Sequence, residues 1–274
     1  MSHESISVTP LTPHIGAELA GVDLRQPSDR QIQEIRAALL AHQVIFFRDQ
    51  AFDLESQKAF GRRFGELHVH PGVPGPAGHP EVMPVRTDAK STYIAGESWH
   101  SDVSCDAEPP MGSILYLKIV PPVGGDTLFA SMYAAYDALS ERMKAHLEGL
   151  TATHDGEPYY RGRYKDKGVD DRGKLYPRAV HPVVRTHPET GRKALYVNRM
   201  FTTHINDLSR EEGEAILGFL IAHCAKPEFQ VRFRWRENSV AFWDNRCVQH
   251  LALWDYYPQT RSGFRVTIKG DKPV

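Results

Sequence analysis

Five side chains in this sequence could together bind a metal ion and an anionic co-substrate. His100 and Asp102 stand two residues apart in WHSD, and His250 ends the segment CVQH far downstream. Two imidazoles and one carboxylate can hold a non-haem Fe(II) ion while half of its octahedron stays open. Arg261 and Arg265 follow, and because a guanidinium pairs bidentately with a carboxylate, they suit a dicarboxylate co-substrate. The combination predicts oxygen chemistry.

The spacing of these residues indicates how they can meet. In an extended segment, residues i and i+2 project from one face, so His100 and Asp102 can reach the same ion. The same alternation places Arg261 and Arg265 on one face of a strand. A core histidine with one hydrogen bond and two solvated arginines are the ordinary alternatives, and spacing alone leaves both interpretations open.

A second pair of histidines offers a competing metal site. His68 and His70 form an HxH pattern, which on a strand can supply two ligands from one face. Together with His100 and Asp102 they would hold zinc or manganese in a cupin that acts as an isomerase or hydrolase, without redox chemistry. That arrangement leaves His250 and the arginine pair without a role. A third hypothesis is a non-catalytic binding module of the same fold.

Helix and strand signals alternate in the first part of the chain. The segment 28–42 opens with Ser28 in a capping-box pattern and places apolar residues on one helical face. An apolar run at 44–47 has the length of a strand. Asp53 can cap a second helix, which Gly65 would end. The start is therefore mixed α and β.

Strand signals dominate the remainder. The clearest is 229–236, where apolar and polar residues alternate. Two further helices are expected, one over about 132–143 and one capped by Ser209. The other expected strands lie at 113–120, 181–186, 194–198, 239–243 and 264–269.

Two stretches lack periodicity and are expected to be loops that lie beside the site. They are the Pro- and Gly-rich stretch 71–80 and the polar stretch 155–173. We find no repeat, heptad or linker, so residues 1–274 are expected to form one domain. Many strands with a few flanking helices favour a mixed α+β fold, mainly β: a double-stranded β-helix, or jelly roll, whose interior can hold a cofactor.

Composition excludes several classes of partner. The formal net charge of -1 gives no electrostatic reason to expect nucleic acid. No run is apolar enough to span a membrane, and the N-terminus lacks the pattern of a signal peptide. Cys105, Cys224 and Cys247 are odd in number and widely spaced, which predicts buried free thiols in a reducing cytoplasm. We also expect a homo-oligomer, either a dimer or a tetramer.

Several motifs together resemble one family. They are FGELHVHP, WHSDVSCDAEPP, GGDTLFAS, HPVVRTHP, PEFQVRFRWR and WDNRCVQH, the last followed by RSGFRVTIKGDKP. In this order they resemble the taurine dioxygenase family of Fe(II)/2-oxoglutarate-dependent dioxygenases. The likeness begins at SISVTPLTPHIG and runs nearly end to end.

The resemblance implies roles for the residues that match. His100, Asp102 and His250 would ligate Fe(II), and Thr127 with Arg261 would bind the distal carboxylate of 2-oxoglutarate. Because three protein ligands leave three coordination sites free, the keto acid and O2 can both bind. The implied reaction converts 2-oxoglutarate to succinate and CO2 and hydroxylates a second substrate.

That second substrate is implied to be a small organic anion. Arg265 would face the anion, and His70, Val103 and Phe201 would line its pocket. The family resemblance makes sulfonates, alkyl sulfates and carboxylates such as phenoxyalkanoates the expected substrates.

The chain departs from the taurine pattern in two places and in one loop. Val73 and Gly96 replace an aromatic residue and an asparagine that help to hold the amine of taurine, so an anion other than taurine is expected. The loop that carries Tyr159 and Tyr160 also differs. These two rings predict a wider or more aromatic pocket.

Overall fold

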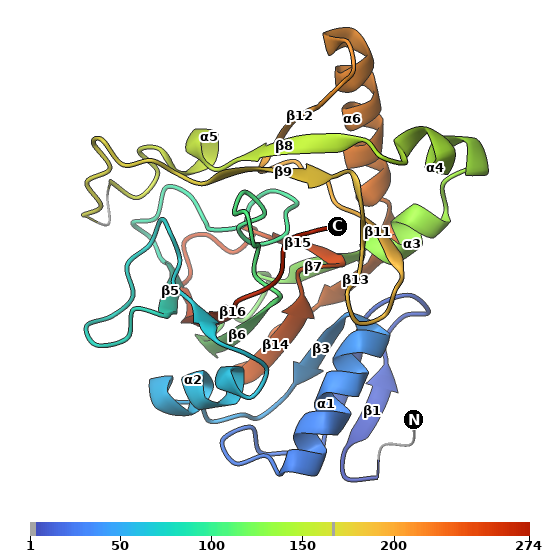
Figure 1. Ribbon diagram of the computed structural model, residues 1–274. Helices are drawn as coiled ribbons and strands as arrows, with labels where there is room; N and C mark the ends of the chain where they lie inside the picture. The colour runs from blue at the N-terminus through green and yellow to red at the C-terminus, as the bar shows by residue number, and fades with distance from the viewer. Residues whose placement is uncertain (1–3, 166–167) are drawn as a thin grey trace.

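The largest sheet lies in the middle of the molecule (Figure 1). The computed structural model describes residues 4–165 and 168–274, and within them this sheet contains eight strands. Its neighbouring strands pair antiparallel, except for the parallel pair β2–β3. In order they are β1 (Ser7–Pro10), β2 (Ala17–Ala20), β3 (Val44–Phe47), β14 (Ser239–Asp244), β6 (Gly112–Ile119), β16 (Arg261–Ile268) and β4 (Leu67–His68), and β5 (Val82–Thr87) also pairs with β16.

Three smaller sheets complete the β structure of the described residues. The first contains β13 (Gln230–Phe233), β7 (Thr127–Ser131) and β15 (Val248–Ala252). The second contains β12 (Thr202–Ile205), β8 (Thr151–Asp155) and β9 (Arg178–Pro182), and the third is the hairpin of β10 (Val184–Thr186) and β11 (Lys193–Leu195). The first of these packs against the large sheet, which gives the predicted jelly roll.

The helices flank this β structure, as Figure 1 shows, with α1 and α2 at one end of the molecule and α6 at the other. Side chains of Ser28, Asp53 and Ser209 cap α1, α2 and α6, each in a capping box. No helix in the described part of the chain is both long and apolar enough to cross a membrane. The helices are α1 (Asp29–His42), α2 (Leu54–Arg62), α3 (Met132–Asp137), α4 (Glu141–Leu147), α5 (Glu157–Tyr160) and α6 (Arg210–Cys224).

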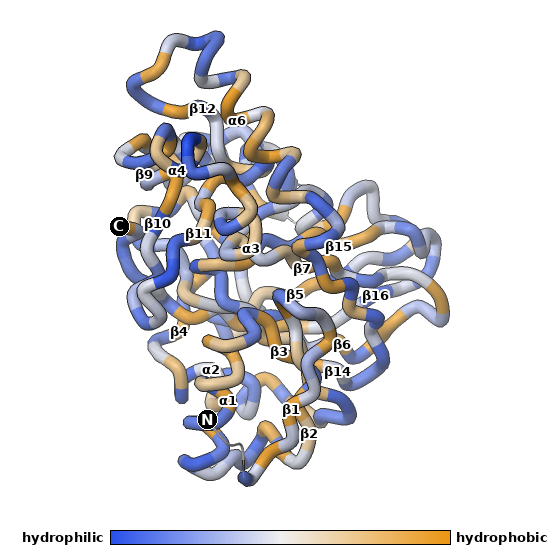
Figure 2. The backbone as a smooth tube through the Cα atoms, turned by 90° about the vertical axis from the view of Figure 1, so that its right-hand side faces the viewer, coloured by the Kyte–Doolittle hydropathy of each residue, from blue (hydrophilic) through white to orange (hydrophobic). Residues whose placement is uncertain are grey.

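The central strands are apolar on both faces because each face has a layer to cover it. In β3, Val44 and Phe46 belong to the core shared with the small sheet, whereas the alternate residues belong to the core shared with α1 and α2. Phe46 stacks on Phe233 of β13, with ring centroids 3.9 Å apart. Figure 2 shows hydrophobic segments in orange along the middle strands, and mostly blue or pale loops at the periphery.

Most expected elements are confirmed, but several have different bounds; α2, for example, ends at Arg62 and not at Gly65. The helix expected over 132–143 is two helices, because the Ser140 side chain accepts a hydrogen bond from the Met143 amide and starts α4. The strand expected at 229–236 is shorter, since only Gln230–Phe233 pairs with β7. The hairpin expected from 181–186 begins later, because residues up to Pro182 pair with β8 instead.

The predicted loops and free thiols are present in the structure, except that the second loop carries a short helix. The stretch 71–80 contains no helix or strand, as expected. The stretch 155–173 carries the short helix α5, and its residues 166–167 lie outside the described part of the chain. The three cysteines are buried and free, as predicted.

The stacked rings between the two sheets make a testable contribution to stability. Phe46 is fully buried, so Phe46→Ala should lower the free energy of unfolding by about 3–5 kcal/mol, measured by urea denaturation. Leu175→Ala is the control, because that side chain is 91% exposed and its loss should change stability by less than about 0.5 kcal/mol. Similar effects from the two substitutions would contradict this packing.

Candidate metal centre and substrate pocket

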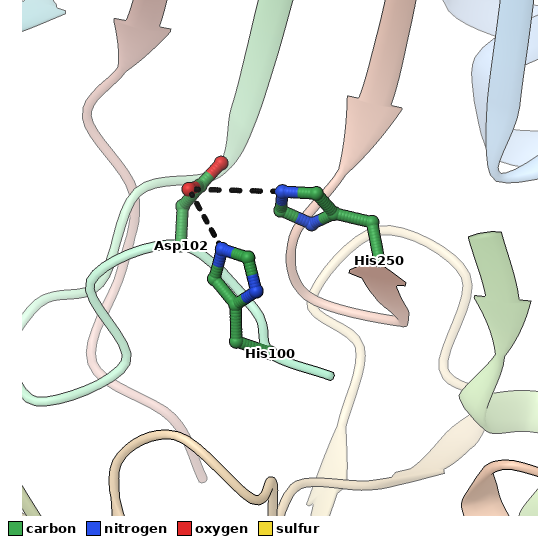
Figure 3. Close-up of side chains that lie close together, drawn as sticks. All are labelled: His100, Asp102 and His250. Carbon is green, nitrogen blue, oxygen red and sulfur yellow. Dashed lines mark ion pairs between the residues drawn. The ribbon is translucent and has the colours of Figure 1, made fainter. Parts of the chain in front are cut away.

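His100, Asp102 and His250 converge in the interior of the jelly roll (Figure 3). The Nε2 atoms of His100 and His250 lie 3.6 and 4.0 Å from Oδ1 of Asp102. One ligand atom from each residue lies within 4.8 Å of the others, and all three residues are buried. The three side chains chosen from the sequence therefore meet at one point.

The backbone brings the two histidines together directly. The amide of His250 donates to the carbonyl of His100 at 2.8 Å, and the reverse hydrogen bond measures 3.2 Å. The two residues thus form an isolated antiparallel bridge. After His100 the chain turns instead of continuing extended, and Val103 adopts a positive φ of 48°. The turn begins at Asp102, and the side chains of His100 and Asp102 reach the same point.

Two buried polar residues orient the carboxylate of Asp102. The Ser113 hydroxyl donates to its Oδ2 at 2.7 Å, and the Asn245 side chain accepts from the Asp102 amide at 3.2 Å. Asn245 also donates to the Ser113 hydroxyl at 3.1 Å. Oδ2 is thereby held by the protein, and Oδ1 faces the histidines. Nothing in the spacing of Ser113 or Asn245 in the sequence indicated this role.

The two imidazoles turn their Nε2 atoms toward Asp102. Nδ1 of His100 donates to the Ser98 carbonyl at 2.8 Å, which leaves Nε2 as the nitrogen that faces the carboxylate. Burial lowers the pKa of His250 well below its ordinary value, and the neighbouring His100 adds to this effect. The His250 ring is therefore neutral.

Asp102 supplies the negative charge of the site. Burial by itself would raise its pKa, but the Arg265 guanidinium, which donates to Oδ1, and the two histidines outweigh this and hold the pKa well below its usual value. The site thus combines one carboxylate with two imidazoles, of which that of His250 is neutral. This donor set fits a divalent cation of the first transition series that accepts nitrogen and oxygen ligands.

Arg261 is a buried cation in the same cavity. Its Nε donates to the Gly125 carbonyl at 3.1 Å, and its Nη2 to the Thr127 hydroxyl at 3.3 Å. Among the described residues, no Asp or Glu forms an ion pair with it, and burial lowers its pKa. A buried guanidinium without an acidic partner favours an anion from outside the chain.

Every residue to which the family resemblance assigns a role at the metal, the keto acid or the substrate lines one cavity. The apolar part of its wall also includes residues that sequence reasoning missed, because a hydrophobic residue beside a cavity has the same pattern as one in the core. The selected residues in the wall are His70, His100, Asp102, Val103, Thr127, Tyr159, Tyr160, Phe201, His250, Arg261 and Arg265, and the missed ones include Met83, Tyr164 and Met200.

The competing pair of histidines does not assemble into a metal site. Nδ1 of His70 accepts hydrogen bonds from the amides of Gly72 and Val73 at 3.0 and 3.1 Å, so its Nε2 carries the proton. Burial lowers the pKa of His70 to about 3, which makes it a neutral donor. His68 instead contacts Asp106 at 3.1 Å. The zinc or manganese site expected as an alternative is therefore wrong.

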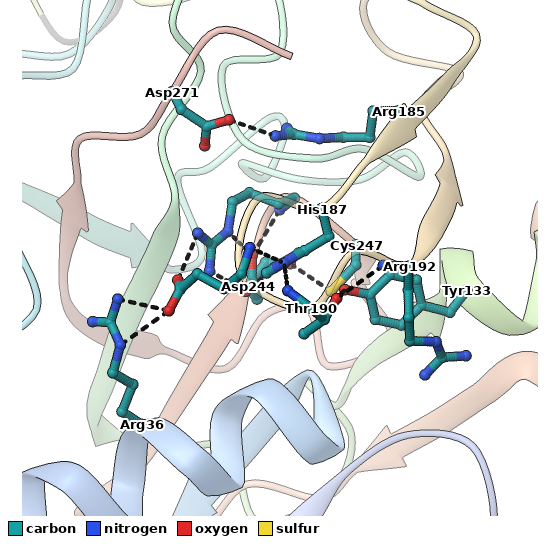
Figure 4. Close-up of polar contacts among 11 residues, drawn as sticks. Arg36, Tyr133, Arg185, His187, Thr190, Arg192, Asp244, Cys247 and Asp271 are labelled. Atoms are coloured by element: carbon teal, nitrogen blue, oxygen red, sulfur yellow. Dashed lines mark hydrogen bonds and ion pairs between the residues drawn. The ribbon is translucent and has the colours of Figure 1, made fainter. Parts of the chain in front are cut away.

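A second group of buried metal-ligand types, His187, Asp244 and Cys247, is occupied by internal hydrogen bonds (Figure 4). Nδ1 of His187 accepts from two amides of the following turn, and its Nε2 donates to Asp244 at 3.0 Å. Both oxygens of Asp244 also accept from Arg246. No lone pair of His187 is left for an ion, so this cluster fixes the turn that precedes β15.

The chain is similar to known proteins over nearly its whole length. The sequence profile described as "Taurine catabolism dioxygenase TauD, TfdA family" matches residues 7–267. An "Alpha-ketoglutarate-dependent sulfate ester dioxygenase" of Pseudomonas putida is 36% identical over 278 residues, which cover 98% of this chain and 91% of that protein.

Two solved structures are similar over nearly the whole chain. A taurine dioxygenase from Burkholderia xenovorans has a TM-score of 0.85 and 39% identity, and the match covers 99% of this chain and 93% of that one. The structure of AAD-2 in complex with Mn(II) and N-oxalylglycine has a TM-score of 0.80 and 32% identity, with coverage of 98% and 99%. The chain therefore belongs to the TauD, TfdA family of dioxygenases.

Proposed function

We propose that this protein is an Fe(II)- and 2-oxoglutarate-dependent dioxygenase that hydroxylates a small organic anion. The observation that carries the proposal is one cavity in which three metal-ligand side chains face two buried arginines. Relatives named for action on sulfate esters, in Pseudomonas putida, and on (S)-phenoxypropionate, in Sphingobium herbicidovorans, support an anionic substrate.

We further propose that residues 1–274 act as a single domain in a cytoplasmic homo-oligomer that binds neither nucleic acid nor membrane. Light scattering after size-exclusion chromatography determines whether the protein is a dimer or a tetramer.

His100, Asp102 and His250 would hold Fe(II), which supplies the site where 2-oxoglutarate and O2 react. The residues of the chain bind and orient the organic groups. Arg261, with the Thr127 hydroxyl beside it, pairs with the distal carboxylate of 2-oxoglutarate, because this guanidinium is buried without an acidic partner of its own.

The primary substrate binds on the other side of the cavity. The Arg265 guanidinium donates to Asp102 and also approaches the Met83 sulfur at 3.1 Å, so an anion paired with it lies beside the metal ligands. His70 adds a neutral N–H donor. The apolar side chains of Val103 and Phe201 keep water away from the carbon that reacts.

The residues that replace the taurine pattern argue for a substrate without an amine. Val73 is buried in an apolar cluster, and Gly96 has no side chain, so neither offers a polar partner to an ammonium group. We therefore propose a sulfonate, an alkyl sulfate or a carboxylate such as a phenoxyalkanoate as substrate.

A screen of anions tests the proposed function directly. Taurine, longer sulfonates, alkyl sulfates and phenoxy acids are each incubated with protein, Fe(II), 2-oxoglutarate and O2, and the release of succinate is measured. At least one non-amine anion should accelerate succinate release. Binding of iron and 2-oxoglutarate without turnover of any anion in a broad panel would contradict the proposal.

The two arginines should have separable effects. Arg261→Ala should raise the KM for 2-oxoglutarate by the equivalent of about 2–5 kcal/mol, because the removed charge is buried. Arg265→Ala should instead raise the KM for the primary substrate. Arg210→Ala, in which an exposed arginine of α6 is removed, is the control. Equal effects of both substitutions on 2-oxoglutarate alone would refute this division of roles.

Gly96 should influence metal affinity through His100. It has a φ of +81°, and a Cβ atom there would lie 3.1 Å from Cε1 of His100. Gly96→Ala should therefore weaken Mn(II) binding roughly tenfold, measured by isothermal titration calorimetry. Gly149→Ala carries the same kind of backbone strain, at φ +77°, but has no neighbour within 4 Å, and should bind Mn(II) like the wild type. Unchanged affinity in Gly96→Ala would show that this contact is unimportant.

Ser113 should influence metal affinity through Asp102. Loss of its hydrogen bond to Oδ2 leaves the carboxylate free to rotate, so Ser113→Ala should weaken Mn(II) binding by about 10–100-fold. Ser239→Ala is the matched control, because Ser239 is equally buried in the same sheet but its hydroxyl accepts from Arg48 and from the Arg236 amide instead of donating to a metal ligand. If both variants bind Mn(II) alike, the proposed orientation of Asp102 by Ser113 is wrong.

A further inference from the structure

Arg163 lies between two aromatic rings at the outer wall of the cavity. Its guanidinium carbon is 4.3 Å from the centre of the Tyr159 ring and 4.6 Å from that of Tyr93. Its Nη2 donates to the Ile94 carbonyl at 2.8 Å and to Glu97 at 2.6 Å. One side chain therefore joins the segment after α5 to the segment that leads into His100.

Both segments joined by Arg163 contribute to the cavity wall. Tyr159 lines the cavity, and so do Ala95 and Gly96 from the other segment. The Gly96 amide also points to the Tyr159 hydroxyl, at 3.5 Å. Because Arg163 holds Tyr159 and the backbone at Ile94 together, it determines how far apart the two sides of this wall stand.

The position of Tyr159 is connected to the metal ligands by ring contacts. Tyr159 packs edge-on against Phe201, with centroids 5.6 Å apart, and Phe201 packs edge-on against His100 at 6.4 Å. A shift of Tyr159 would thus change the space available between the outer wall and the metal ligands.

The contacts of Arg163 with two rings, a carbonyl and a carboxylate suit arginine better than lysine. Only 16% of the Arg163 side chain is exposed, so protein groups, not water, stabilise its charge. A planar guanidinium can stack between two rings and still donate to both a carbonyl and a carboxylate. A lysine keeps the charge but lacks the planar fork.

We propose that Arg163 is a positioning residue that determines specificity: it clamps the outer wall of the cavity and so limits the size of the substrate anion. Arg163 itself does not line the cavity, and it acts through Tyr159. The kinetic part of this inference rests on the proposed function, whereas its structural part does not.

Arg163→Ala tests the clamp with two independent readouts, and Arg172→Ala is the matched control. Arg172 lies in the same region of the chain, but its side chain is 89% exposed and, among the described residues, bonds only to Asp170. The first readout is cleavage by chymotrypsin. Arg163→Ala should be cut about tenfold faster than the wild type after Tyr159, Tyr160 or Tyr164, whereas Arg172→Ala should be cut at the wild-type rate.

The second readout separates the two substrates. In Arg163→Ala, the KM for the best anion should rise about tenfold and the preference for it over a longer homologue should shrink. The KM for 2-oxoglutarate should stay unchanged, because Arg261 is held by the Gly125 carbonyl and the Thr127 hydroxyl and not by Arg163 or Tyr159. Arg163→Lys should fall between the wild type and Arg163→Ala, and it replaces Arg163→Ala if that variant does not fold.

Three results would overturn the proposal. One is proteolysis of Arg163→Ala at the rate of Arg172→Ala. Another is an unchanged preference among anions of different length. The third is an equal rise in both KM values, which would indicate general damage to the site. If the wild type turns over no anion, the proposed function fails, and the rate of proteolysis still decides whether Arg163 clamps the wall.

Discussion

The main-chain pairing of His100 with His250 is the constraint on which the site depends. These residues are 150 positions apart in the sequence, yet reciprocal amide–carbonyl hydrogen bonds of 2.8 and 3.2 Å hold their backbones together. The imidazoles therefore do not need a metal to bring them near one another. The turn that begins at Asp102 places its carboxylate beside both imidazoles. Ser113, on β6 of the large sheet, donates to this carboxylate and orients it. The relative positions of the three side chains thus follow from the backbone pairing inside the jelly roll.

The cavity inside the jelly roll also contains charged side chains that are not fully paired within the protein. Asp102, Arg261 and Arg265 are all buried, and only the first and the last pair with each other. An interior charge is costly unless it is compensated, so the cavity is incomplete without an anion and a cation from solution. We propose that these charges are compensated by a ferrous ion, a dicarboxylate and an organic anion. Aromatic walls on one side keep these charges away from water.

The sequence was sufficient to select three side chains that meet at one point and to predict much of the fold, because both leave local or strongly patterned signals. The capping box at Ser28 identified α1, and the HxD pattern with its downstream arginines identified residues that all line one cavity. Contacts between segments that are distant in the chain could not be predicted from the sequence. Asn245 supports Asp102 from 143 positions away, and Arg163 reaches Glu97 across 66, so no spacing rule could have paired them. Short strands such as Ser7–Pro10 were missed because four residues show no clear alternation.

The central claim is that His100, Asp102 and His250 bind one ferrous ion whose open side faces Arg261. The most direct measurement is an iron anomalous difference map from crystals grown anaerobically with Fe(II) and 2-oxoglutarate. We expect a single strong peak in contact with the two Nε2 atoms and Asp102 Oδ1, with density for the keto acid extending to Arg261. A peak beside His68 or His187, or no peak within bonding distance of His250, would contradict the account.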